Sequence, residues 1–124
     1  MANSLQQIEA EIKRDVTRLH KTVIGKGPGH TSIHISDNVL TVIFQNSLSS
    51  VEISMLQVPE GYKKINEIRN DLLNANSHNL VAILKRWINT DVQKITSVVI
   101  PETAEVYLFI IFKDKVDANI DNRY

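Results

Sequence analysis

The first 25 residues place their hydrophobic positions on one side of a helix. Apolar side chains recur at steps of three or four residues, and Glu, Lys, Arg and Gln occupy the positions between them. This spacing predicts an amphipathic helix over residues 4–24, with Ser4 and Gln7 as a possible capping box at its start. We expect Gly25 to end the helix, because it tolerates the left-handed conformation of a C-cap, and Pro28 to prevent its continuation.

The next segment has the pattern of a β-hairpin. Residues 32–36 alternate polar and apolar side chains, as in a half-buried strand, and residues 39–45 are apolar on both faces. Asp37 and Asn38 lie between them, and both residue types tolerate the positive φ angles of a two-residue turn. Two antiparallel strands are therefore expected here.

A helical pattern returns in the middle of the chain and is interrupted once. Ser49 or Ser50 can cap a short helix over residues 51–57, and a longer helix follows from Tyr62. The asparagine-rich stretch 74–79 contains poor helix formers and predicts a kink or break. A helical face then resumes to about residue 89 and carries Leu80, Ile83, Leu84, Trp87 and Ile88. Trp87 lies on this apolar face, which favours packing in the core or at a dimer interface.

A second hairpin completes the pattern. Residues 92–100 and 105–112 are predicted strands, joined by a turn at residues 101–104. The run 106–112 is apolar without interruption, which is typical of a strand buried on both faces. The helices from the middle of the chain can cover one face of the sheet. Either the first helix or a second subunit must then cover the other, and we expect a homodimer.

These elements predict an α+β protein with a four-stranded, mainly antiparallel sheet packed against helices. The length of 124 residues fits a single domain, residues 1–124. Residues 113–124 have mixed charge and no clear pattern, and we expect them to form a frayed tail.

Composition excludes several classes of function. Fourteen basic residues balance 14 acidic ones, whereas a general nucleic-acid binder usually has a basic excess. The absence of cysteine excludes thiolate chemistry and zinc–cysteine or iron–sulfur sites, and it fits a reducing cytoplasm. The N-terminus lacks the pattern of a signal peptide, and the longest apolar run is too short for a transmembrane segment. A cytoplasmic location is therefore expected.

Several short motifs resemble a known family. They are the loop Gly25-Lys26-Gly27-Pro28, the helix start with Leu48, Ser49 and Glu52, and the later helix with Ile68, Arg69 and Leu72. Together with the order of elements, they resemble the MpsC-like family of small bacterial proteins. That family is named after a proposed component of a Na+-translocating system that generates a membrane potential. The resemblance spans the chain from the first helix to the last hairpin.

The resemblance implies a non-enzymatic accessory protein that binds other proteins, a membrane transport protein being one possible partner. It transfers no catalytic residue, sodium site or cofactor to this chain. The sequence also departs from the family pattern. Residues 96–99 read Thr-Ser-Val-Val, where the family usually has an acid, and residues 74–79 are less acidic than usual.

The chain lacks a recognisable catalytic motif. The glycine loop is not a P-loop, and it follows the C-terminus of a helix, the end that disfavours phosphate. His30 and His34 are about 13 Å apart on an extended strand, too far for one metal ion. No serine lies in a G-x-S-x-G motif or has an obvious His and acid nearby. We therefore expect no enzyme, no metal and no cofactor.

Basic side chains form the one marked charge cluster. Arg14, Arg18 and Lys21 share a stripe on the first helix, and residues 13–26 hold five basic side chains against one acidic, a net charge of +4. Two functions remain open. The stripe and the loop with Lys26, Gly27, Pro28 and His30 can be the contact surface of a protein-interaction module. Alternatively, the stripe serves a weak nucleic-acid-binding module.

Overall fold

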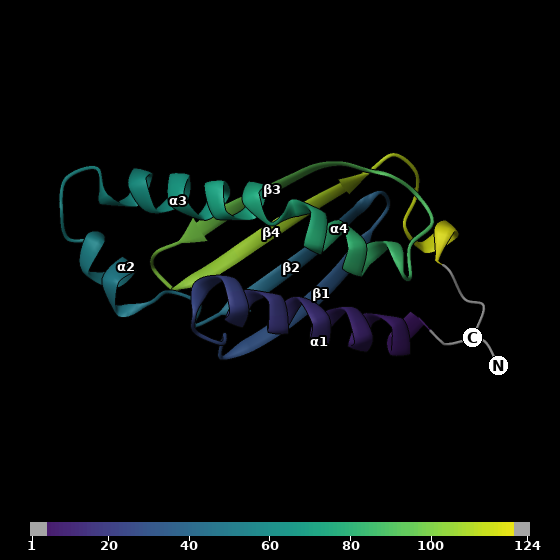
Figure 1. Cartoon of the computed structure of the whole chain (residues 1–124), viewed down its shortest axis with the longest axis horizontal. Helices are drawn as coiled ribbons and strands as arrows, with labels where there is room; N and C mark the ends of the chain where they lie inside the picture. Colours follow the sequence, from purple (N-terminus) through teal and green to yellow (C-terminus); the bar gives the residue numbers. More distant parts are fainter. Residues whose placement is uncertain (1–4, 121–124) are drawn as a thin grey trace.

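The computed structural model describes residues 5–120 and has the predicted order of elements (Figure 1). The elements are α1 (Leu5–Ile24), β1 (His30–Ser36), β2 (Val39–Gln45), α2 (Ser50–Met55), α3 (Gly61–Ala75), α4 (Ser77–Lys85), β3 (Val92–Ile100), β4 (Glu105–Phe112) and the 3-10 helix η1 (Asp117–Asn119). The α+β class and the four-stranded antiparallel sheet are confirmed. The capping box predicted at Ser4 falls outside the described residues.

Local turn chemistry explains where these elements end. Gly25 has a φ of +83° and donates its N–H to the carbonyl of Lys21, closing α1 as predicted. Asp37 takes a positive φ of 56° in the turn between β1 and β2. Of the two serines considered for the next helix, Ser49 is the cap, since its hydroxyl accepts from the N–H of Glu52.

The helices α1, α3 and α4 lie on the same face of the sheet (Figure 1). The sheet has the order β1-β2-β4-β3. On the helix side, alternate residues of β2 and β4 are buried, and these are Leu40, Val42, Phe44, Val106, Leu108, Ile110 and Phe112. They form one core with Ile8, Ile12 and Val16 of α1 and with Leu80 and Leu84 of α4.

The opposite face of the sheet is not covered by any element among residues 5–120. Within a single copy the last strand is buried on one face only, because Tyr107, Phe109 and Ile111 on the other face of β4 are only half-buried. Cover of that face by a second subunit stays a prediction. Of the two covers considered for this face, the first helix does not provide one. Helix α1 packs beside α4 instead, since both direct their apolar stripes at the same core.

Side chains of α3 cover the free edge of β3. Asn70 accepts from the N–H of Ser97 and donates to its carbonyl, both at 2.9 Å. Asn66 accepts from the N–H of Val99, and the hydroxyl of Tyr62 donates to the carbonyl of the same residue. These bonds satisfy backbone groups that an edge strand otherwise leaves open to pairing.

The segment after β4 differs from the expected frayed tail as far as residue 120. Val116 is fully buried, and its N–H donates to the carbonyl of Asp37. Ile120 forms a β-bridge with Ile88, just after α4. Apolar residues at 116 and 120, in a segment of mixed charge, are enough to hold it against the end of the sheet. The last four residues of the predicted tail are outside the described part of the chain.

Replacing Gly61 with alanine is expected to lower the free energy of unfolding by about 3 kcal/mol. A Cβ at this position would lie 1.7 Å from the carbonyl oxygen of Met55, so the turn between α2 and α3 would have to move. Gly27→Ala is the matched control, because a Cβ there meets nothing within 4 Å. We expect the control to change stability by less than about 1 kcal/mol in urea unfolding. Equal effects of the two substitutions would contradict this explanation.

Candidate functional site

A polar cluster lies in the core where the end of α1 meets the segment between β2 and α2. Its centre is His20, which is 6% exposed and follows Ile8, Ile12 and Val16 at four-residue steps on the buried side of α1. The ring of His20 also lies against Phe44 of β2, with the ring centroids 4.6 Å apart. A histidine thus occupies a position that the helix period assigns to the core.

The hydrogen bonds of His20 define its tautomer. Nδ1 lies 2.8 Å from the carbonyl oxygen of Lys26, which can only accept, so Nδ1 carries the proton. Nε2 then accepts from the hydroxyl of Ser47 at 2.6 Å. Ser47 is fully buried, and its hydroxyl oxygen in turn accepts from Nη1 of Arg69 at 3.3 Å. All three side chains therefore satisfy one another with His20 neutral.

Arg69 connects this cluster to α2 through a two-pronged ion pair. Its Nε donates to Oε2 of Glu52 at 2.6 Å, and its Nη2 donates to Oε1 at 2.7 Å. The same Nη2 donates to the carbonyl of Ser47 at 2.7 Å. Glu52 also accepts from the N–H of Ser49 in the capping box. One guanidinium thus joins α3 to α2 and to the segment that precedes it.

The electrostatics of the cluster agree with these bonds. Burial, reinforced by the positive charge of Arg69, lowers the pKa of His20 from 6.5 to about 4. Burial acts to raise the pKa of Glu52, but hydrogen bonds from Arg69 and Ser49 outweigh it, and that pKa lies below its usual value. At neutral pH the cluster therefore holds a neutral histidine beside a charged arginine–glutamate pair.

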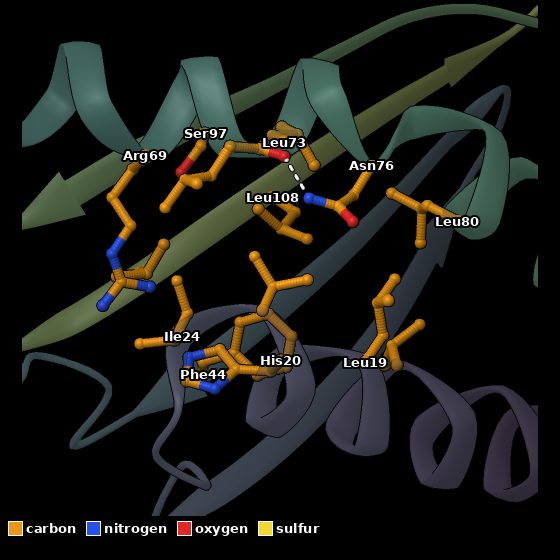
Figure 2. Close-up of a pocket in the computed structure, with 14 residues that line it drawn as sticks. Leu19, His20, Ile24, Phe44, Arg69, Leu73, Asn76, Leu80, Ser97 and Leu108 are labelled. Atoms are coloured by element: carbon orange, nitrogen blue, oxygen red, sulfur yellow. Dashed lines mark hydrogen bonds between the residues drawn. The ribbon is translucent and has the colours of Figure 1, made fainter.

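A small apolar cavity adjoins the cluster between α1, α3 and α4 (Figure 2). Its volume is about 70 Å³, and its walls are mainly Leu, Ile, Val and Phe side chains. His20 and Arg69 reach its edge from facing helices, whereas Ser47 does not line it. A serine–histidine pair is the arrangement of an activated nucleophile. The hydroxyl here faces the imidazole of His20 and the guanidinium of Arg69 and does not reach the cavity.

Two of the residues predicted as a binding surface, Arg14 and Arg18, have acidic neighbours on α1. Arg14 is exposed and forms a salt bridge with Glu11, and Arg18 lies 3.9 Å from Asp15. Asp15 is also 3.6 Å from Arg86 of the segment after α4. The stripe on α1 is therefore interspersed with acidic partners that the net charge of the segment conceals.

The glycine loop contributes one residue to the cluster and leaves the others outside it. Lys26 donates from Nζ to the carbonyl of Leu48 at 2.9 Å, while its own carbonyl accepts from His20. Gly27 and Pro28 are half-buried connectors, and Lys21 and His30 are exposed. His30 and His34 lie on one strand as predicted, and among residues 5–120 no three His, Asp or Glu side chains are grouped as a metal site needs.

The cluster as a unit was not predicted from the sequence. No sequence motif marks His20, and Ser47 does not lie in a G-x-S-x-G motif. Two signals could have pointed to the cluster. His20 continues the four-residue period of buried positions, and Glu52 and Arg69 are two of the residues on which the family resemblance depends. The structure pairs those two residues directly.

The chain matches a protein-family model. The model described as "Na+-translocating membrane potential-generating system (MpsC)" matches residues 4–114, nearly the whole chain. No curated protein and no solved structure matches the chain significantly. Within residues 5–120, none of the helices has the length and hydropathy needed to cross a lipid bilayer.

Replacing Arg69 with lysine is expected to lower the free energy of unfolding by about 2–4 kcal/mol. Lysine keeps the charge but cannot bind both oxygens of Glu52 and the carbonyl of Ser47 at once. Arg14→Lys is the matched control, because Arg14 is exposed, and it is expected to stay within about 0.5 kcal/mol of the parent protein. Chemical denaturation followed by circular dichroism measures both. A loss below about 1 kcal/mol for Arg69→Lys would refute the central role of this guanidinium.

Acidification is expected to destabilise the protein between about pH 6.5 and pH 4. In this interval the unfolded chain binds a proton at His20 and the folded chain does not, so stability falls as pH falls. The shift corresponds to about 2–3 kcal/mol at pH 4. Below the usual pKa of glutamate, protonation of Glu52 adds a further loss as pH falls through its lowered pKa.

Urea unfolding at a series of pH values measures this effect. We expect His20→Gln to flatten the dependence between pH 6.5 and 4, whatever its effect on absolute stability. His78→Gln is the control, because His78 is exposed on α4 and lies outside the cluster, and it should leave the dependence unchanged. A pH dependence that is the same in all three proteins would show that His20 does not cause it.

Proposed function

The chain belongs to the MpsC family, and we propose that it is a non-enzymatic accessory subunit of a Na+-translocating system that generates a membrane potential. In this proposal the protein acts on the cytoplasmic side as a homodimer and binds a membrane transport protein. It contributes an interaction surface and no chemical step.

The observation that carries the proposal is a concentration of exposed apolar side chains around α2. Val51 is 73% exposed, and Ile53, Val58 and Tyr62 are each more than 40% exposed. Helix α2 has no buried residue and projects beyond the body of the protein (Figure 1). Apolar side chains gathered on a projecting segment are typical of a surface that binds another protein.

The segment is also held rigidly, which favours binding because less conformational entropy is lost. Glu52 ties α2 to Arg69 of α3, and the capping box fixes the start of the helix. At the other end, Tyr62 anchors the beginning of α3 to the carbonyl of Val99. The polar cluster thus holds α2, and with it the exposed apolar side chains, in one position relative to α3. Its groups are engaged with one another, which supports a structural role for them over a catalytic one.

The nucleic-acid alternative receives less support from the geometry. Phosphate binding needs basic side chains that are free to lose their counterions. Arg14 and Arg18 already have acidic neighbours on α1, and Lys26 is bound to the carbonyl of Leu48. We therefore do not propose it, although the experiment below detects it.

A native pull-down from a detergent extract of the source cell tests the proposal. The parent protein is expected to recover a membrane transport protein, identified by mass spectrometry. The double substitution Val51→Ser, Ile53→Ser should reduce that recovery at least about fivefold, as truncation of anchoring apolar residues does. Ile68→Ser is the matched control, because Ile68 is 51% exposed on α3 and lies outside α2.

Two results would overturn the proposal. The first is an eluate without any transport protein. The second is recovery of the transport protein by the double variant Val51→Ser, Ile53→Ser that equals its recovery by the control Ile68→Ser. Nucleic acid in the eluate that disappears with Arg14→Glu, Arg18→Glu and weakens steeply with salt would favour the alternative function.

A further inference from the structure

We propose that two copies of this chain pack through the uncovered faces of their sheets, about a twofold axis that runs across the strands. The inference deepens the proposed function, because it assigns the surface of the homodimer. It concerns the side of the sheet opposite α1, α3 and α4, which is distinct from the apolar surface of α2.

The uncovered face is apolar over β2, β4 and β3 and polar along the edge strand β1. Its large apolar side chains are Val39 and Ile43 of β2, Tyr107, Phe109 and Ile111 of β4, and Val98 and Ile100 of β3. These residues alternate with the buried core positions, so they stand on the other side of the sheet. The β1 positions on this face are His30, Ser32, His34 and Ser36.

The size of this face suits an interface between copies. Four strands about 4.8 Å apart and seven residues at about 3.3 Å give roughly 450 Å² in projection. Side-chain relief makes the accessible area larger, of the same order as the roughly 800 Å² that each partner buries in a stable complex. The apolar part of this face falls in the range of the largest apolar patch on a typical monomer, about 300–600 Å², and such a patch is often functional.

The register of the sheet shows why a second copy fits. Ile33, Val42, Leu108 and Ser97 are paired across the four strands and form a row near its middle. A twofold axis parallel to this row, between two facing sheets, keeps each strand over its own copy and reverses its direction. Positions equally far from the row are then brought opposite each other in all four strands.

This symmetry produces complementary neighbours. In β4, Tyr107 faces Phe109 of the second copy, so aromatic rings meet at the centre of the interface. In β1, His30 faces Ser36 of the second copy and Ser32 faces His34, so each imidazole meets a hydroxyl rather than another imidazole. Twist offsets aligned sheets by about 30°, which affects the corners more than the central aromatic residues.

The charged residues of this part of the face are also complementary. Lys94 lies at one end of β3, and Glu105 lies at the opposite end of β4, paired with Ile100. Six residues of extended strand separate the two ends by about 20 Å, too far for a salt bridge within one chain. The twofold axis places Lys94 over Ile100 of the second copy, beside Glu105 of that copy. Each charge therefore gains an opposite charge in the dimer.

Edge-to-edge association is disfavoured at β3 and remains the competing arrangement at β1. The amides of Asn66 and Asn70 already bind the backbone of Ser97 and the N–H of Val99 on the β3 edge. The β1 edge offers polar alternate side chains and would leave the apolar face of β2, β4 and β3 in water. Burial of that face is the larger gain, since apolar area dominates association.

Sedimentation equilibrium of the full chain, from 1 to 100 µM, tests the interface. We expect a species of twice the 14.1 kDa chain mass. Phe109→Lys should weaken dimerisation at least about tenfold, because it places a charge against the aromatic centre. Ile68→Lys is the control, since it adds the same charge on α3, and should leave the dimer unchanged. Circular dichroism verifies that each variant is folded.

A charge exchange between Lys94 and Glu105 tests the symmetry itself. Unlike Phe109→Lys, it does not place a charge at an apolar position. Lys94→Glu and Glu105→Lys should each weaken the dimer at least about threefold, because each change occurs in both copies and replaces two exposed ion pairs with pairs of like charge. The double variant should recover most of the parent affinity. Rescue can arise only between copies, because the two residues are too far apart within one chain.

Three results would overturn the inference. They are a monomer throughout the concentration range, a dimer that Phe109→Lys leaves intact, and single charge variants without rescue. A monomer that still captures a transport protein would overturn this inference and leave the proposed binding of a transport protein standing. A dimer that captures no transport protein would support this inference and overturn the proposed function.

Discussion

The guanidinium of Arg69 is the group on which the arrangement of this protein depends. It binds both oxygens of Glu52, the carbonyl of Ser47 and the Ser47 hydroxyl, and so joins α3, α2 and the segment before α2. His20 extends the network to α1 and the glycine loop. A buried charge is tolerated only where its donors are satisfied, so each of these elements is confined to one position. The ion pair therefore contributes more to fixing the relative positions of these elements than to the net free energy of unfolding.

The second constraint is the unequal cover of the sheet. Three helices pack on one face, and the described residues leave the other face open. Asparagine side chains of α3 cover the edge of β3, which directs association toward the open face rather than the edge. The exposed apolar residues of α2 lie apart from this face. One surface for a second copy and another for a partner would allow both contacts to form together.

The family motifs acquire a physical meaning in this arrangement. The helix start with Ser49 and Glu52 forms the capping box, and Arg69 from the later helix closes on the same glutamate. Lys26 of the glycine loop binds the carbonyl of Leu48, the residue that opens the helix-start motif. Motifs that are 17 to 22 residues apart along the chain thus meet at one cluster. They describe how the fold is locked, which explains why no reaction could be inferred from them.

The sequence by itself determined the elements, because their signals are local. The period of apolar residues, the glycine and proline stops and the Asp-Asn turn indicated the helices, both hairpins and the break after α3. Only the tertiary structure decided which face α1 covers, how Val116 is packed and that His20, Ser47 and Arg69 form one network. The hydrogen bonds among them join residues 22 to 79 positions apart along the chain. The placement of α1 depends instead on which of the two faces of the sheet is the more apolar. A single sequence carries the period of each segment but not the relative placement of its segments, and that placement is set by burial and hydrogen bonding over the whole chain.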